Sequence, residues 1–229
     1  MVTDGLNPFT LLLFLAAAAG TLGAGLAWLF AIISGRVSLA KAVARIGAGA
    51  LAVYAGLLLT ASLLSRERVL PIGGEKHICE IDCHTAYAVV HVDTMHTIGS
   101  GAAQRTAEGE FYVVTLQVRF DSATISSHRG MGPLAPGPRT VKIHDRDGRW
   151  YERSAAAESA LAASEGAPVP LTKSVIPGEH YTTKVVFDLP AGIDGPRLLV
   201  AAKAAFPDAL VIGYENSVLH GKITFRIDG

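Results

Sequence analysis

"FYVVTLQVRF", residues 111–120, is the stretch that decides the fold of the C-terminal part of the chain. Its apolar and polar side chains alternate, so a single face carries Tyr112, Val114, Leu116, Val118 and Phe120. A repeat of two residues is typical of a β-strand that is buried on one side. The segment therefore predicts a sheet with one face packed into a core.

Other short segments with a similar pattern surround this strand, at residues 141–152, 182–190, 197–206 and 222–227. The first of them contains Asp147-Gly148, a pair that tolerates positive φ and can turn a hairpin. The stretch "SAAAESALAASE", residues 154–165, instead has the composition of a short helix. Together these segments predict an all-β, antiparallel two-sheet sandwich with one short helix.

The order of these segments resembles a known group of domains. "GEFYVVTLQVRF", the hairpin "HDRDGRWYERS", the Ala-rich helix, "VIPGEHYTTKVVFDLP" and the closing "ENSVLHGKITFRI" are similar to telokin-like, immunoglobulin-like domains of exported bacterial proteins. The likeness covers residues 85–229 and implies an immunoglobulin-like sandwich there. It implies no catalytic residues, because members of that group mostly lack an assigned chemistry.

The N-terminal part of the chain has the composition of membrane-spanning helices. No charged residue occurs from Phe9 to Ile33 or from Ile46 to Leu64, and about 20 apolar residues suffice for a helix to cross the hydrocarbon core. A cleavable signal peptide is the alternative for the first stretch, but no basic region precedes it. We therefore expect two transmembrane α-helices that form a hairpin within residues 1–66.

The charges around the two stretches predict their orientation. Arg36, Lys41 and Arg45 lie between them, and basic connections favour the cytoplasmic side. The N-terminal tail carries Asp4 and no basic residue. We therefore expect a protein of the bacterial cytoplasmic (inner) membrane, with its N-terminus and the whole region after Leu64 outside the cytoplasm.

Overall charge and known catalytic motifs limit the function classes. The 20 Lys and Arg residues balance the 20 Asp and Glu residues, so the chain has no electrostatic reason to bind nucleic acid. The sequence contains no Ser-His-Asp order, Gly-rich phosphate loop or HExxH motif. We therefore expect that the protein is not an enzyme.

Both cysteines and half of the eight histidines lie in "HICEIDCHTAYAVVHVDTMH", residues 77–96. In an extended strand the Cα atoms of Cys79 and Cys83 would be about 13 Å apart, too far for a disulfide or a shared metal. The segment must therefore turn if these cysteines cooperate. Thiolate, imidazole and thioether are the ligands that copper prefers. The candidate copper ligands are Cys79, Cys83, His84, His91, Met95 and His96.

Three readings of this segment remain open. A structural Cys79–Cys83 disulfide fits an oxidising compartment. Copper binding fits the ligand types, and the layout of a two-span hairpin followed by an outer β-domain with C-x3-C is similar to cytochrome oxidase subunit II. Thiol–disulfide exchange is disfavoured, because Glu80 and Asp82 oppose a lowered thiol pKa.

The expected organisation is a two-span hairpin at 1–66, a juxtamembrane Cys/His segment at 67–84 and the sandwich at 85–229. The expected function is that of a membrane-anchored extracytoplasmic accessory or binding protein, with copper handling through the Cys-x3-Cys-His segment as a candidate role. The alternatives are a protein-interaction module with a Cys79–Cys83 disulfide and a dithiol oxidoreductase. The expected partners are the bilayer and a membrane or extracytoplasmic protein.

Overall fold

The structure, a computed structural model, describes residues 2–5, 8–79, 83–123 and 131–228. The chain forms two compact units. The sheet unit comprises the described residues of 1–5, 67–204 and 222–229, and the helical unit those of 6–66 and 205–221. Residues 205–221, which the sequence assigns to the outer domain, thus belong to the same unit as the two long helices.

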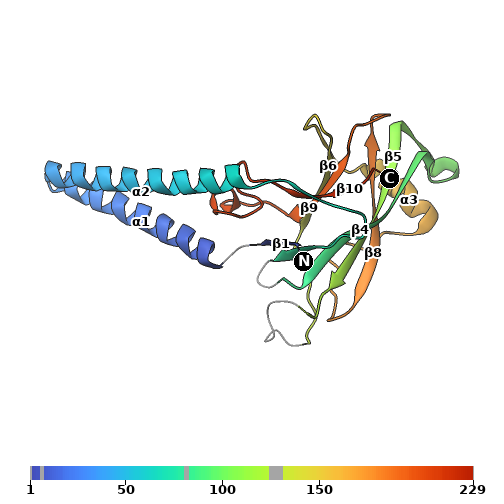
Figure 1. Ribbon diagram of the computed structural model, residues 1–229, viewed down its shortest axis with the longest axis horizontal. Helices are drawn as coiled ribbons and strands as arrows, with labels where there is room; N and C mark the ends of the chain where they lie inside the picture. Colours follow the sequence, from blue (N-terminus) through green and yellow to red (C-terminus); the bar gives the residue numbers. More distant parts are fainter. Residues whose placement is uncertain (1, 6–7, 80–82, 124–130, 229) are drawn as a thin grey trace. The chain divides into compact units, whose positions relative to one another are not determined.

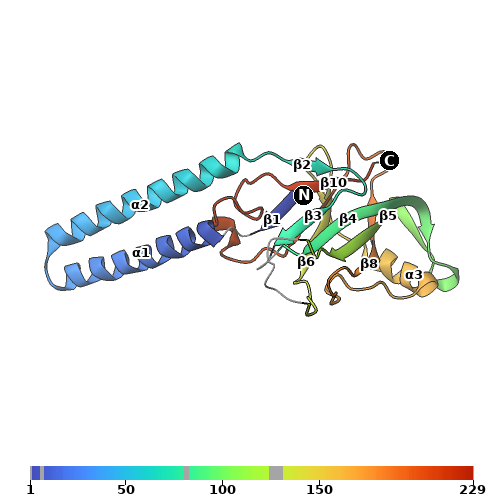
Figure 2. The ribbon, with the colours of Figure 1, turned by 60° about the horizontal axis from the view of Figure 1, so that its bottom comes forward.

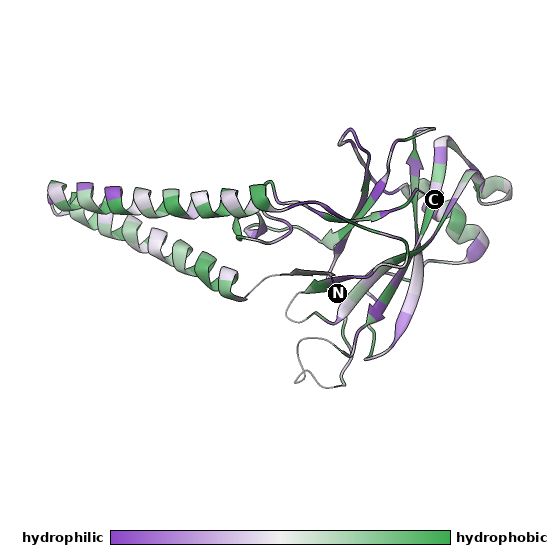
Figure 3. Ribbon diagram, viewed as in Figure 1, coloured by the Kyte–Doolittle hydropathy of each residue, from purple (hydrophilic) through white to green (hydrophobic). Residues whose placement is uncertain are grey.

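The helical unit contains α1 (Pro8–Ile33) and α2 (Val37–Leu64), which run side by side in opposite directions (Figure 1). Both are long and apolar enough to cross a membrane, as predicted, and the colouring of the ribbon in Figure 3 shows that most of their residues are hydrophobic. The second helix begins earlier than its apolar stretch, because Lys41 and Arg45 continue the helix. The connection between the helices is therefore short.

The sheet unit contains two five-stranded sheets and one α-helix. In spatial order, the first sheet consists of β1 (Val2–Gly5), β3 (Lys76–Cys79), β4 (Thr85–Ile98), β5 (Arg105–Phe120) and β8 (His180–Leu189). The second consists of β2 (Arg68–Leu70), β10 (Ile223–Arg226), β9 (Arg197–Ala202), β6 (Arg139–His144) and β7 (Trp150–Tyr151). The helix α3 (Ala155–Glu165) and two short 3₁₀ turns, η1 (Gly101–Ala103) and η2 (Asp208–Leu210), complete the described elements.

One edge of each sheet is parallel, so the fully antiparallel sandwich predicted from the sequence needs correction. Strand β1 pairs with β3 in parallel, and β2 pairs with β10 in parallel, whereas the other pairs are antiparallel (Figure 2). Parallel neighbours need a long connection between them. The two long helices lie between β1 and β3 in the chain, and most of the sheet unit lies between β2 and β10.

The main core lies between the two sheets, where the alternation in the quoted strand predicted it. Val114, Leu116, Val118 and Phe120 of β5 are buried there, and Tyr112 packs against them. Strand β8 contributes its alternate side chains in the same way. Both sheets supply further members of this core, among them Ile78, Tyr87, Ile143, Phe187, Leu198, Val200 and Phe225.

A second, smaller core covers the other face of the first sheet. Phe111 and Val113 of β5 pack there with Ala157 and Ala160 of α3. The side chain of Ser154 accepts a hydrogen bond from the Ala157 backbone N–H and so caps the helix. The short helix predicted at 154–165 therefore exists, and it explains why the second face of β5 is also apolar at Phe111 and Val113, in the middle of the strand.

The side chain of Lys76 links the two sheets. This residue of β3 is fully buried, and its ammonium donates hydrogen bonds to the carbonyls of Val200 (2.7 Å) and Ile223 (3.2 Å) in the second sheet. A buried ammonium is tolerated only where such acceptors replace water. The position of β3 is therefore set by a polar contact as well as by apolar packing.

Gly109 in β5 provides a test of how closely the strands approach. A Cβ atom at this position would overlap the Leu189 carbonyl oxygen, and the backbone atoms there cannot move aside easily. We expect Gly109→Ala to lower the free energy of unfolding by about 1–3 kcal/mol, measured by thermal unfolding of the full chain in detergent. Gly132→Ala is the matched control, because a Cβ there meets no atom within 4 Å. Equal effects of the two substitutions would contradict this packing.

Candidate functional site at the disulfide end of the first sheet

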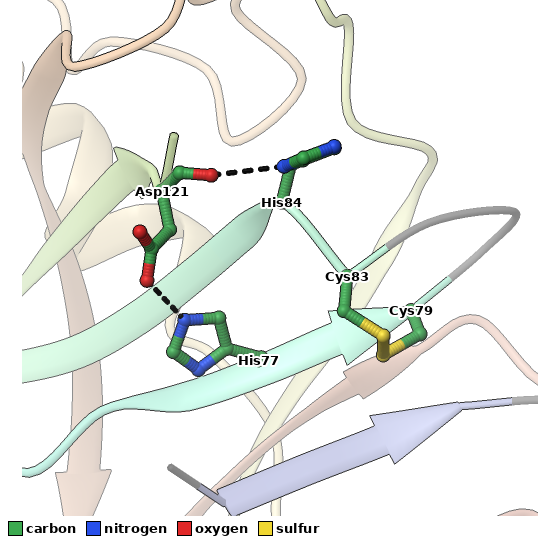
Figure 4. The surroundings of a disulfide bond; sticks show 5 residues. All are labelled: His77, Cys79, Cys83, His84 and Asp121. Atoms are coloured by element: carbon green, nitrogen blue, oxygen red, sulfur yellow. Dashed lines mark hydrogen bonds and ion pairs between the residues drawn. A yellow bond between two sulfur atoms is a disulfide. The ribbon is translucent and has the colours of Figure 1, made fainter. Parts of the chain in front are cut away.

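The two cysteines are joined. Cys79 ends β3, Cys83 lies just before β4, and their sulfur atoms form a disulfide with a Cα–Cα distance of 4.1 Å (Figure 4). The antiparallel register that pairs Ile78 with Thr85 brings the two ends together. The two cysteines therefore lie as close as their cooperation requires, and residues 80–82 between them, where the sequence analysis expected the turn, lie outside the described residues.

A row of paired residues next to the disulfide places His77 near Arg119. His77 in β3 lies opposite Ala86 in β4, which lies opposite Arg119 in β5. Directly opposed residues point to the same face of a sheet, and the small side chain of Ala86 leaves room between its two neighbours. The register of three strands thus assembles a polar cluster from residues far apart in the chain.

The polar cluster consists of Glu75, His77, Arg119 and Asp121. The Arg119 guanidinium donates two hydrogen bonds to Glu75, from Nε to Oε1 (2.8 Å) and from Nη2 to Oε2 (2.7 Å). Its Nη2 also donates to Asp121 Oδ2 (3.1 Å), which lies 2.9 Å from His77 Nε2. This arrangement combines a bidentate ion pair with a shared carboxylate oxygen.

The cluster perturbs the acidity of its carboxyl groups. Burial raises the pKa of Asp121, but the hydrogen bonds from His77, the Ala123 N–H and Arg119, together with the Arg119 charge, outweigh it. The pKa of Asp121 is therefore about 2, below its usual 3.8. The hydrogen bond from Arg119 likewise lowers the pKa of Glu75. Both groups are ionised at neutral pH.

Three members of the cluster have the ligand types and spacing for a metal ion. Ligand atoms of Glu75, His77 and Asp121 lie within 4.8 Å of one another. The Arg119 guanidinium, however, donates to both carboxylates and supplies the positive charge that a metal would bring. A metal ion would have to displace these hydrogen bonds, so the geometry describes a salt-bridge cluster better than a metal centre.

His84 has a packing role beside the cluster. Its Nδ1 lies 2.9 Å from the backbone oxygen of Asp121, and since a carbonyl only accepts, Nδ1 carries the proton. The Asp121 backbone N–H in turn donates to the His84 carbonyl (2.7 Å). The His84 ring stacks on Phe120 at a centroid distance of 5.0 Å. These contacts tie the start of β4 to the end of β5, as Figure 4 shows in part.

The other candidate copper ligands lie further along β4. His91 is exposed and interacts with Asp93 (2.9 Å), Met95 packs against the smaller core, and His96 lies near the Gly109 carbonyl (3.3 Å). A strand rises about 3.3 Å per residue, so His96 is on the order of 40 Å along the chain from His84.

The single copper site predicted from Cys79, Cys83, His84, His91, Met95 and His96 is therefore unsupported. Its thiols form a disulfide, and the extended strand keeps its other ligands apart. The disulfide alternative is the one that the structure contains. Glu75, Arg119 and Asp121 were not identified from the sequence, because no local motif connects them and only the strand register does.

No family model and no curated protein matches the chain. A conserved hypothetical protein from Bacillus anthracis is similar in structure, with 18% identity, 52% of this chain and 85% of that chain covered, and a TM-score of 0.38. The secreted protein MPT63 from Mycobacterium tuberculosis is similar with 14% identity, 60% and 98% covered, and a TM-score of 0.37. Likeness at this level carries no argument about fold or function.

The disulfide is expected to contribute modestly to stability, because it closes a very short loop. Replacing both Cys79 and Cys83 by Ser should lower the free energy of unfolding by about 2 kcal/mol, from the loop-closure entropy alone. Thermal unfolding of the full chain in detergent, with and without reductant, measures this. The double variant serves as the control, since reductant should not change its melting temperature. An unchanged melting temperature of the wild-type protein in reductant would contradict the expectation.

Asp121→Asn should destabilise the sheet unit at neutral pH by about 1–3 kcal/mol, because Arg119 and His77 lose a partly buried, ionised acceptor. A folded-state pKa below the unfolded value adds stability above about pH 4, and this is lost as pH falls toward 2. The difference between wild type and variant should therefore shrink over that range in pH-dependent thermal unfolding.

Asp194→Asn is the matched control for this substitution, because the Asp194–Arg146 pair is mostly exposed and should contribute little. If the difference in stability between the wild type and Asp121→Asn stayed constant from pH 5 to pH 2, the ionised carboxylate would not stabilise the cluster.

Proposed function

We propose that this protein is a membrane-anchored binding module whose sheet unit lies outside the cytoplasm. The observation that carries the proposal is the parallel pairing of β1 with β3, in which Val2 lies opposite Lys76 and Gly5 opposite Cys79. Strand β1 precedes the first apolar helix, and β3 follows the second. The chain therefore leaves this sheet, passes through two helices and returns to the same sheet.

This connectivity limits how the helices can cross a bilayer. Two strands of one sheet must lie on the same side of the membrane, and an even number of crossings returns the chain to the side where it began. Two spans satisfy this condition and a single span does not. Removal of α1 as a signal peptide would also remove β1, so the pairing supports a retained two-helix anchor.

Two further features support an extracytoplasmic sheet unit. Arg36, Lys41 and Arg45 lie in and just after the connection between the two helices, and basic residues favour the cytoplasmic side. The Cys79–Cys83 disulfide suits an oxidising compartment, whereas thiols in the cytosol are kept reduced. Both features favour the same orientation.

We propose binding in preference to catalysis, with a membrane or extracytoplasmic protein as the partner. The ionisable groups at the disulfide end contact one another, which suits a structural role. On the second sheet, Trp150 lies in the edge strand β7, is 49% exposed and packs against His144 at a centroid distance of 4.8 Å. A half-exposed, supported tryptophan is a frequent anchor of protein interfaces.

Single cysteines can test the orientation, because the native cysteines are joined and do not react. We expect Met131→Cys, at an exposed position of the sheet unit, to react with a membrane-impermeant maleimide in intact spheroplasts. Ser34→Cys, between the helices, should react only after permeabilisation. A peptide tag placed before Met1 should be accessible to antibody under the same conditions as Met131→Cys.

Unmodified protein is the control and should stay unlabelled unless it is first reduced. If the maleimide labelled Ser34→Cys in intact spheroplasts while Met131→Cys stayed unlabelled, the orientation would be the opposite of the one proposed. Reaction of both without permeabilisation would show that the helices do not span the membrane.

A further inference from the structure

Residues 205–221, "AFPDALVIGYENSVLHG", form a segment that the anchor and binding roles do not explain. It belongs to the helical unit although it follows the strands of the sheet unit in the chain. The Tyr54 hydroxyl of α2 donates to the Leu210 carbonyl (2.7 Å), and the Gly221 N–H donates to Oγ of Ser65, the residue that follows α2 (2.6 Å). The segment is therefore bonded beside the helix and at its C-terminal end.

The Tyr54 contact shows that the segment lies alongside α2 and not only beyond its end. Tyr54 precedes Leu64, the last residue of α2, by ten positions, which is about 15 Å at 1.5 Å per residue. A tyrosine side chain is shorter than that distance, so the Leu210 carbonyl lies beside the last turns of the helix. Leu58 and Ser62, at four-residue intervals on the same face as Tyr54, are buried.

The segment satisfies many of its backbone polar groups internally. The Leu210 and Val211 N–H groups donate to the carbonyls of Pro207 (2.8 Å) and Asp208 (3.1 Å), and the Val218 N–H donates to Ala209 (3.1 Å). Within the hydrocarbon region, backbone groups must find partners in the protein, because water is absent. A compact loop bonded in this way meets that condition over much of its length.

The side chains that the segment exposes are apolar. Phe206 is 88% exposed, Leu219 is 66% exposed, and Leu210 and Val218 are also exposed. The segment contains no Lys or Arg, and of its two carboxylates Glu215 is buried and Asp208 is partly buried and accepts a hydrogen bond from the Ala205 N–H (2.9 Å). Leu219 has a φ of 58°, in the left-handed region that most side chains avoid. Leu219 thus combines an exposed apolar side chain with an uncommon backbone conformation.

We propose that residues 205–221 insert into the outer leaflet of the bilayer, with Phe206 and Leu219 in contact with lipid. The inference rests on the proposed membrane anchor, because it is the attachment to α2 that brings these side chains to the level of the apolar helix. The occupant is lipid because the segment that exposes these side chains is hydrogen-bonded to a helix whose own exposed side chains are apolar. The Tyr54 hydroxyl then has an acceptor where no water is available.

The test uses the full chain in vesicles of phosphatidylcholine and phosphatidylglycerol. An environment-sensitive fluorophore is attached to Phe206→Cys or Leu219→Cys, and spin-labelled lipids quench it from near the headgroup or from deep in the acyl chains. We expect at least twofold stronger quenching by the shallow label at these positions than at Met131→Cys, the matched exposed apolar residue of the sheet unit. Leu22→Cys, exposed near the middle of α1, should respond most to the deep label.

Two variants test the basis of the insertion. With the fluorophore at 206, Leu219→Asn should weaken the shallow quenching, because asparagine tolerates the left-handed conformation but is polar. With the fluorophore at 219, Tyr54→Phe should weaken it as well, since the Leu210 carbonyl loses its donor. Unchanged quenching in both variants would overturn the role given to these contacts.

The other outcomes separate this inference from the membrane anchor. Deep quenching at 22 without quenching at 206 and 219 would leave the anchor intact and overturn the insertion. If those positions were also protected from iodide in solution, a protein surface, such as a second copy of the chain, would cover the segment instead of lipid. Lack of quenching at 22 would overturn the anchor itself.

Discussion

The parallel pairing of β1 with β3 is the constraint on which the rest of the structure depends. A strand before the first apolar helix and a strand after the second share one ladder of backbone hydrogen bonds. Because this pairing joins a residue range before α1 to one after α2, the chain must leave the first sheet, pass through both helices and return to the same sheet. The proposed two-helix anchor rests on that connectivity.

The disulfide end of the first sheet illustrates how a site rich in chemically active residues can serve structure. Arg119 brings a fixed positive charge between two carboxylates, and the resulting network also contacts His77. The residues that could have bound a metal are thereby held by one another. Because the cysteines are joined at the end of β3, the same region is stabilised by a covalent bond, an ion-pair cluster and the stacking of His84 on Phe120.

Local patterns were sufficient for most of the elements. The alternation in residues 111–120 predicted both a strand and its buried face, because a period of two is a property of the extended backbone itself. The Asp147-Gly148 turn is found where expected, with Gly148 at a φ of 79°. The helices were predictable from composition alone. Boundaries were less certain: α2 begins before its apolar stretch, because charged residues with high helix propensity continue it.

By itself, the sequence determined the two apolar helices, the alternating strands and the presence of two cysteines four residues apart. These are properties of neighbouring residues and need no knowledge of distant ones. Only the tertiary structure decided that β1 and β2 add parallel edges, that Arg119 joins Glu75 to Asp121, and that residues 205–221 belong with the helices. Each of these depends on contacts between segments that are far apart in the chain. Strand register and packing determine such contacts, and the local periodicity of the sequence does not predict them.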